Sequence, residues 1–344
     1  MSSNMELKIY KSMKDDFLRD AWKKMEASGS PFCYYDYMSY IERYVKRYSF
    51  YSVRIACVTT PSEGILMIVP LKWDRYKHIY KMLGDIKGCG QTDALFAPAL
   101  PMERQRECVS FFYTTLGQQF YIRRLPPDSP LRAIPEGIPN KEKLEMECVS
   151  IHFPFESGQT LSKSVRQNIR TAYNRMKRDN ICYEFKVYHR GTISMEGKLW
   201  RKMTDIYVER LLSKYKKKAR NNPLYRKIFA WRYKYLKHDT KSLRSLPNSL
   251  HAVLMCGDNI MAFSSGFMSH DEKTLVIPRL SINATFRTYS PGYVLLTELQ
   301  HYLESETPCR TMDLSRGTEQ YKLDLGGIRY NTYAVKTVNA ANPT

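Results

Sequence analysis

Residues 251–304 read HAVLMCGDNIMAFSSGFMSHDEKTLVIPRLSINATFRTYSPGYVLLTELQHYLE, and they define the architecture that we expect. Three apolar runs follow one another closely: His251 to Cys256, Ile260 to Phe267 and Lys273 to Ser281. Short polar segments rich in Gly, Asp, Asn and Ser separate them, which is typical of strands joined by tight turns. We therefore predict an antiparallel meander of three strands.

A helix start follows the meander. Ser290 is a residue type that favours the N-cap position, and Pro291 suits the first helical position. Gly292 lets a ligand approach the backbone closely, and the free amides of a first helical turn can bind an anion. We predict a helix from Tyr293 to Glu304 with an anion site at its start, although many helices begin in this way.

A second amphipathic helix opens the later half of the chain. Apolar residues recur at intervals of three and four between residues 161 and 176, which predicts one buried face. Lys163, Arg166 and Arg170 recur on the other face and project together. This basic face contacts either an anionic ligand or solvent.

The rest of the chain alternates between helical and strand patterns. In the first half we expect helices at residues 15–26, 36–47 and 102–116, and strands at residues 51–59, 64–72, 120–125 and 146–153. In the second half we expect a strand at residues 181–188 and a long helical region at residues 198–237. We place a domain boundary near residue 155, which divides the chain into residues 1–155 and 156–344.

The positive charge is concentrated in one segment. The 344 residues contain 54 Lys+Arg and 34 Asp+Glu, a formal net charge of +20. Residues 161–244 hold 24 of the basic and 6 of the acidic residues, so this segment accounts for +18. A focused positive field attracts nucleic acid, a phosphorylated cofactor or an anionic lipid-linked surface, although a solvated basic face is equally compatible with the count.

Composition also bounds the cellular context. The longest apolar run, near residues 65–71, is far shorter than the roughly 18 residues of a membrane-spanning helix. The first twenty residues lack a signal-peptide core. Eight cysteines are scattered without a C-x-x-C pair, which favours reduced thiols and no metal site. We expect a cytoplasmic protein.

The segment from Asp313 to Lys322, DLSRGTEQYK, resembles a family signature. It is similar to the D-x-x-R-G-x-E-x-Y-K motif of the CelD/BcsL-type (BioF2-like) branch of the GNAT acyltransferases, which are related to Fem-type peptidyltransferases. Residues 162–180, SKSVRQNIRTAYNRMKRDN, resemble the basic helix of that branch, and residues 290–292 match its S-P-G. The likeness extends from about residue 31 to about residue 327, but the helix start has fewer glycines than the usual GNAT phosphate loop.

The resemblance implies an α/β (α+β) fold of tandem GNAT-like halves. Each half would be a mixed, mostly antiparallel sheet flanked by helices, and the second would bind acyl-CoA, with acetyl-CoA as the first candidate. The coenzyme A pyrophosphate would lie at the helix start. The expected cofactor-binding residues are Arg287, Ser290, Gly292 and Tyr293.

Direct acyl transfer from a thioester needs a base, oxyanion donors and a proton source for the leaving thiolate, without a covalent intermediate. Asp313 and Glu319 are candidate bases, and Tyr321 is a candidate acid. Backbone amides around residues 279–281 would be the oxyanion donors by analogy. The expected contacts to an anionic substrate are Lys163, Arg166, Arg170, Arg316 and Lys322. The alternative is that this segment has no catalytic role and forms a structural turn in which Arg316 pairs with Asp313 or Glu319.

Three functions compete. The first is an acyl-CoA-dependent N- or O-acetyltransferase or other acyltransferase acting on a small-molecule or lipid-linked sugar in polysaccharide biosynthesis. The second is a Fem-type transferase that uses aminoacyl-tRNA, and the third is a non-catalytic nucleic-acid-binding protein, which the sequence supports less. An anionic membrane surface is a further candidate partner, and the sequence does not define an oligomeric state.

Overall fold

The computed structural model describes residues 4–86, 88–117, 119–154, 161–189, 197–215 and 222–337. The chain divides into two compact units, one of Met1–Cys148 with Tyr330–Thr344 and one of Val149–Arg329. The sequence predicted a single boundary near residue 155. In the structure the last strand returns to the first unit, because it pairs there with an earlier strand.

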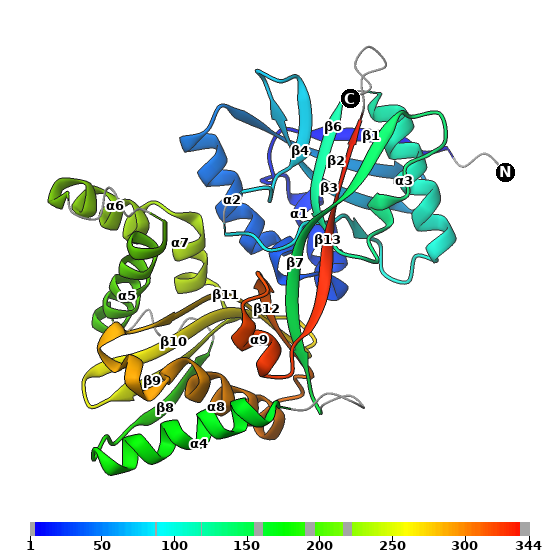
Figure 1. Ribbon diagram of the computed structural model, residues 1–344. Helices are drawn as coiled ribbons and strands as arrows, with labels where there is room; N and C mark the ends of the chain where they lie inside the picture. Colours follow the sequence, from blue (N-terminus) through cyan, green and yellow to red (C-terminus); the bar gives the residue numbers. More distant parts are fainter. Residues whose placement is uncertain are drawn as a thin grey trace. The chain divides into compact units, whose positions relative to one another are not determined.

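The first unit contains a mixed sheet with the strand order β1-β2-β3-β4-β6-β13-β7 (Figure 1). In addition, β5 pairs with β3. Its strands are β1 (Glu6–Tyr10), β2 (Tyr51–Thr60), β3 (Gly64–Asp74), β4 (Ile79–Met82), β5 (Leu95–Phe96), β6 (Phe120–Leu125), most of β7 (Asn140–His152) and β13 (Ile328–Thr337). Its α-helices are α1 (Asp16–Met25), α2 (Tyr35–Tyr48) and α3 (Met102–Leu116).

Local sequence explains these boundaries. The Asp15 carboxylate accepts a hydrogen bond from the Leu18 amide at 2.9 Å and caps α1. Gly117 has a φ of 57° and ends α3 in the left-handed conformation, which costs a glycine little. The buried side chains of α3 pack against one face of β2 and β3, and α2 contacts β2. Helix α3 thereby covers one face of the first sheet.

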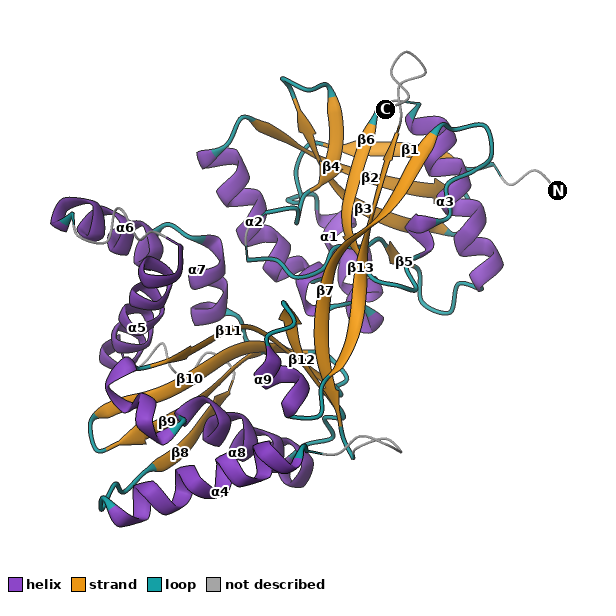
Figure 2. Cartoon of the chain, viewed as in Figure 1, coloured by secondary structure: helices purple, strands orange, loops and turns teal. Residues whose placement is uncertain are grey.

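The second unit carries the strand order β7-β12-β11-β10-β9-β8, beginning with the end of β7 (Figure 2). Its strands are β8 (Glu184–His189), β9 (Ser249–Cys256), β10 (Asn259–Met268), β11 (Thr274–Ile282) and β12 (Thr311–Arg316). Its helices are α4 (Lys163–Arg178), α5 (Gly197–Tyr215), α6 (Pro223–Tyr235), α7 (His238–Ser245), α8 (Pro291–Glu306) and α9 (Gln320–Asp324).

Alternate side chains of the second sheet meet different helices, as the two-residue period of a strand requires. Leu250 and Ala252 of β9 belong to a core cluster built with α4 and α8. Between them, His251 points to the other face, where its ring lies 5.6 Å from the ring of Trp200 on α5. Helices therefore cover both faces of this sheet, and the predicted amphipathic helix α4 lies on one of them.

The two units share an order of elements. In the first, β2, β3 and β4 are antiparallel neighbours, and β6 follows α3 and pairs parallel to β4. In the second, β9, β10 and β11 are antiparallel neighbours, and β12 follows α8 and pairs parallel to β11. The predicted fold class, mixed and mostly antiparallel sheets flanked by helices, is confirmed.

Some elements differ from the prediction. The long helical region predicted at residues 198–237 is divided into α5 and α6, with Pro223 at the first position of α6, and α7 follows as a separate helix that was not predicted. Residues 216–221, which include most of the basic KYKKKAR run, lie outside the described residues. The short strands β1 and β4 and the final strand β13 were not predicted.

Candidate active site

Strands β11 and β12 separate soon after they pair. Within the described chain their parallel register contains three pairs and stops at Val276 and Asp313, although β11 continues to Ile282 and β12 to Arg316. Pro278 has no backbone N–H to donate, so it cannot extend the ladder as other residues do. We call the region beyond Val276 and Asp313 the C-terminal fork.

Helix α8 begins beside this fork. Its Gly292 lies so near β11 that an added Cβ would stand 3.2 Å from the Ile282 Cγ2 atom. Pro291 occupies the first helical position as predicted, and Ser290 precedes it with a φ of 45°. The Ser290 side chain accepts no capping hydrogen bond from any described residue, which differs from its predicted role as a cap. Arg287 is exposed one turn earlier.

The closing signature meets the first turn of α8. The rings of Tyr293 and Tyr321 lie edge to face with centroids 6.5 Å apart. The Tyr293 hydroxyl also donates to an Asp324 carboxylate oxygen at 3.5 Å. Burial, followed by the Asp324 charge, raises the pKa of Tyr293. The structure thus brings together one predicted cofactor residue and one predicted catalytic residue from segments about thirty positions apart.

Asp313 lies at the point of separation. Its side chain is buried, and its Oδ1 atom accepts a hydrogen bond from the Ser315 amide at 2.7 Å. Ser315 has a φ of 57°, so β12 turns sharply just beyond Asp313. The half-buried Arg316 ends the strand. The position of Asp313 places a carboxyl group beside the unpaired edges of both strands.

Lys322 is enclosed by the turn that follows β12. Its side chain is 4% exposed, and its Nζ atom donates to the carbonyl oxygens of Leu314, Arg316 and Gly317 at 3.0, 2.7 and 2.9 Å. The same ammonium group pairs with Glu319 at 3.1 Å. We expected Lys322 to contact an anionic substrate, but a buried ammonium with these acceptors instead holds the turn in place.

Glu319 is the anionic partner of two lysines. Its carboxylate pairs with Lys322 and, at 3.7 Å, with Lys214 of α5. Burial raises the pKa of Glu319, but the Lys322 charge and hydrogen bond outweigh it, so the net pKa is lowered. A lowered pKa makes a carboxylate a poorer proton acceptor. This environment makes Glu319 a weaker base than an ordinary glutamate.

Tyr321 remains protonated over a wide pH range. Burial raises its pKa to about 12, helped by the Glu319 charge and opposed by Arg210 of α5. A phenol with such a pKa holds its proton at neutral pH and can donate it in a hydrogen bond. Tyr321 can therefore donate a hydrogen bond, but the raised pKa makes it a weaker acid than an ordinary tyrosine.

The basic residues of α4 lie elsewhere. Lys163, Arg166 and Arg170 are all exposed. Near the other end of α4, Arg175 donates to the Thr288 carbonyl at 3.0 Å, just before α8. Helices α4 and α8 pack together, so Lys163 lies about three turns from the contact with Thr288. The structure does not bring Lys163 to the start of α8.

Two basic residues near the fork were not predicted individually. Lys214 pairs with Glu319, and the charge of Arg210 lies close enough to affect the pKa of Tyr321. Their signal in the sequence was the +18 segment, which contains α5. Arg279, whose backbone was an expected oxyanion donor, directs its buried guanidinium to Asp239 at 3.3 Å.

The first unit has a corresponding fork. Strands β4 and β6 pair in parallel only at Tyr80 with Phe120 and Lys81 with Tyr121, within the residues that the structure describes. We call the region beyond these two pairs the N-terminal fork, and Thr92 lies there alongside β6. Its amide donates to the Arg124 carbonyl at 3.0 Å, and its hydroxyl donates to the Arg123 carbonyl.

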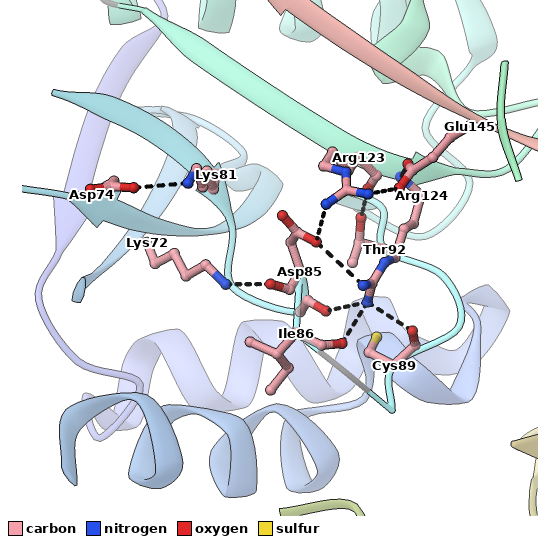
Figure 3. Close-up of polar contacts among 11 residues, drawn as sticks. Lys72, Asp74, Lys81, Asp85, Ile86, Cys89, Thr92, Arg123, Arg124 and Glu145 are labelled. Atoms are coloured by element: carbon pink, nitrogen blue, oxygen red, sulfur yellow. Dashed lines mark hydrogen bonds and ion pairs between the residues drawn. The ribbon is translucent and has the colours of Figure 1, made fainter. Parts of the chain in front are cut away.

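Charged side chains fill the N-terminal fork (Figure 3). The Arg124 guanidinium donates to the carbonyl oxygens of Ile86 and Cys89 at 2.6 and 2.9 Å. Asp85 pairs with Arg123 and Arg124 at 3.4 and 3.5 Å. The chain itself therefore satisfies this edge of β6.

Comparison with known proteins supports the fold. Residues 163–323 match the family model described as an acetyltransferase (GNAT) domain. L-PGS from Bacillus licheniformis is similar in structure, with a TM-score of 0.58 and 13% identity over 96% of this chain and 94% of that one. A conserved protein of unknown function from Bacteroides thetaiotaomicron VPI-5482 has a TM-score of 0.55 and 14% identity over 93% of this chain and 96% of that one.

FemX is also similar, with a TM-score of 0.45 and 9% identity over 94% of this chain and 96% of that one. No curated protein matches the sequence. Residues 163–323 are a GNAT-type acetyltransferase domain, and the protein is a transferase. No helix in the described parts of the chain is both long and apolar enough to cross a membrane.

Proposed function

We propose that the protein is an acyl-CoA-dependent N- or O-acyltransferase of the CelD/BcsL-type branch, with acetyl-CoA as the first candidate donor. The C-terminal fork carries this proposal. Its strand edges stop pairing beside Asp313 and beside the first turn of α8, whereas the chain fills the N-terminal fork with its own groups. Within the described residues, the first unit thus pairs its exposed strand edge with its own chain, whereas β11 and β12 of the second unit stop pairing after Val276 and Asp313.

The residues around the fork suit the parts of acyl-CoA. An extended chain with amide groups can pair with an unpaired strand edge, here β11 beyond Val276. The start of α8, with exposed Arg287 one turn earlier, suits the pyrophosphate. Ser290, Gly292 and Tyr293 line that first turn.

Asp313 and Tyr321 divide the chemistry between them. The acceptor nitrogen or oxygen attacks the thioester carbonyl, and its proton passes to the Asp313 carboxylate. Backbone amides near residues 279–281 stabilise the oxyanion. The carbon–sulfur bond then breaks, and the thiolate takes a proton from Tyr321, which is protonated at neutral pH.

The acceptor is proposed to be a sugar or a lipid-linked precursor of a cell-envelope polysaccharide. The exposed Lys163, Arg166 and Arg170, with half-buried Arg316, are the proposed contacts to its anionic groups. No disulfide joins the eight cysteines, all of which lie in the described parts of the chain, and a cytoplasmic site of action is part of the proposal. The family resemblance supports the acceptor class, and this part of the proposal does not rest on the fork.

Binding of the donor is the direct test. Acetyl-CoA at 100 times its dissociation constant should stabilise the native protein by about 2.7 kcal/mol, which thermal unfolding detects. A response to RNA without any response to acyl-CoA would contradict the proposal. That outcome would favour the aminoacyl-tRNA-dependent transferase or a nucleic-acid-binding protein, for which the +18 segment is the motivating observation.

A further inference from the structure

Helix α6 carries apolar side chains on two faces. On the inner face, Tyr225 and Phe229 stack with centroids 6.1 Å apart, and Phe229 lies 5.6 Å from Tyr233. Tyr233 is buried and meets the Tyr207 ring of α5 at 5.6 Å. This face attaches α6 to the rest of the second unit.

The outer face of α6 exposes four large apolar side chains, which we call the α6 stripe. Their exposed fractions are 67% for Leu224, 50% for Ile228, 54% for Trp231 and 53% for Tyr235. Successive helical residues are about 100° apart, so the spacing of four, three and four places the stripe within an arc of roughly 60°. Such a row of exposed apolar residues is unusual on a protein surface that faces only water.

The cations of α6 divide between the two faces. Arg226 pairs with Glu209, and Lys234 pairs with Asp205 at 2.6 Å, so both lie against α5. Lys227 and Arg232 are exposed and have no ion-pair partner among the described residues. By helical geometry they flank the α6 stripe on opposite sides, each roughly 60–70° from its centre.

We propose that the α6 stripe docks on the surface of an anionic lipid membrane. An apolar row flanked by exposed cations matches an interfacial helix, in which the apolar side chains enter the headgroup boundary and the cations meet lipid phosphates. Trp231 and Tyr235 are residue types that favour this interface. Helix α6 has no acidic residue, so nothing on it opposes a negative surface.

Charge also separates this partner from the alternatives. Pairing of two α6 helices from two copies of the chain would bring Lys227 and Arg232 near like charges. Contact with RNA would give Leu224 and Ile228 no apolar surface to cover. The inference does not depend on acyl-CoA as donor, and it would place a lipid-linked acceptor close to the enzyme.

Vesicle flotation of the full chain tests the inference. The protein should float with phosphatidylcholine vesicles that contain 30% phosphatidylglycerol and should remain unbound with pure phosphatidylcholine. K227E with R232E should weaken binding by roughly fivefold or more for each lost charge. I228S and W231A should each weaken it severalfold, and a circular dichroism spectrum checks that each variant folds.

Matched controls come from the first unit. The exposed fraction of Leu144, 63%, is similar to the 67% of Leu224. L144A should therefore leave binding unchanged, while L224A weakens it. R106E, at an exposed position of α3, is the matched charge control. Absence of vesicle binding by the wild type, or equal loss in the controls, would overturn the proposal. A dimer that W231A dissociates would assign the stripe to a second copy instead, and RNA binding lost in I228S would assign it to RNA.

Discussion

The two units differ in how they treat the strand edges that are exposed where a parallel strand pair separates. Each contains a parallel strand pair that stops after two or three residue pairs, β4 with β6 and β11 with β12. In the first unit, a returning segment and the Arg124 side chain occupy the edge that this separation exposes. In the second, Asp313 and the start of α8 border the fork, and the described chain inserts no comparable segment there.

This difference is our reason to propose that the second unit, and not the first, binds the donor. Filling the N-terminal fork requires buried charges: Lys72 is 1% exposed, and burial lowers its pKa to about 8. Its ammonium donates to the Asp85 carbonyl at 2.7 Å. In the N-terminal fork the polar groups already have partners within the protein. The unpaired strand edges of the C-terminal fork would gain hydrogen bonds when a ligand binds. We attribute a structural role to the N-terminal fork and propose a catalytic role for the C-terminal fork.

Removal of the guanidinium from the first fork should have the largest effect. R124M removes the donor to the carbonyl oxygens of Gly84, Ile86 and Cys89 and leaves Arg123 as the remaining ion-pair partner of Asp85. Breaking a buried pair costs about 3–5 kcal/mol. Urea unfolding should show this loss of stability. R106M, an exposed arginine of α3, is the control and should change stability little. An R124M protein as stable as the wild type would refute the view that this fork is held by charge.

Lys322 provides the matching test in the second unit. K322M should lower the free energy of unfolding by about 3 kcal/mol, because buried carbonyl oxygens and Glu319 lose their donor. Urea unfolding measures this loss. If stability is unchanged and only the Michaelis constant for the acceptor rises, the original expectation of substrate contact is correct and the turn does not need the lysine.

The sequence predicted the helices and strands of both units better than it predicted which of them pair or form the candidate site. The meander, α3, α4 and the start of α8 follow local periodicity, so their patterns are visible without tertiary contacts. Strand β13 was missed because its pairing with β6 joins residues some two hundred positions apart. Pro278 was not singled out from the sequence, because its effect on the pairing of β11 depends on which strand lies beside it.

The candidate site was predictable in part. The closing signature and the α8 start were found separately, and the contact between Tyr293 and Tyr321 depends on the fold. Burial of Lys322 could not be inferred, because a lysine in a polar decapeptide ordinarily faces solvent. The local excess of positive charge pointed to the segment of α5 but could not single out Arg210 and Lys214.

Tyr321→Phe tests whether the C-terminal fork takes part in the chemical step. Loss of a positioned proton donor should lower kcat by about a hundredfold, while acyl-CoA binding is preserved because only the hydroxyl is removed. Steady-state kinetics and donor binding by calorimetry separate the two. Y113F, which changes a buried tyrosine of the first unit, is the control and should keep its turnover. Wild-type turnover in Y321F would exclude Tyr321 from the chemical step.

His251 tests how the second unit tolerates a buried polar group. Burial lowers its pKa to about 3, so the folded state keeps it neutral while an unfolded histidine, with a pKa near 6.5, binds a proton. The unfolded state therefore binds more protons below pH 6.5, and this group should cost about 2 kcal/mol of stability between pH 7 and pH 5. Urea unfolding at both pH values should show that H251Q lacks this loss. The exposed H270Q should retain it, and an equal pH dependence in H251Q and the wild type would contradict the prediction.

Hydrogen exchange with and without acetyl-CoA tests the central claim most directly, because one measurement reports on both forks. We predict slower exchange, on donor binding, in peptides that cover residues 277–282 and 290–294. Peptides that cover residues 83–92 should exchange as before. Protection confined to residues 83–92, or none anywhere at saturating acetyl-CoA, would contradict the assignment of the donor site to the second unit.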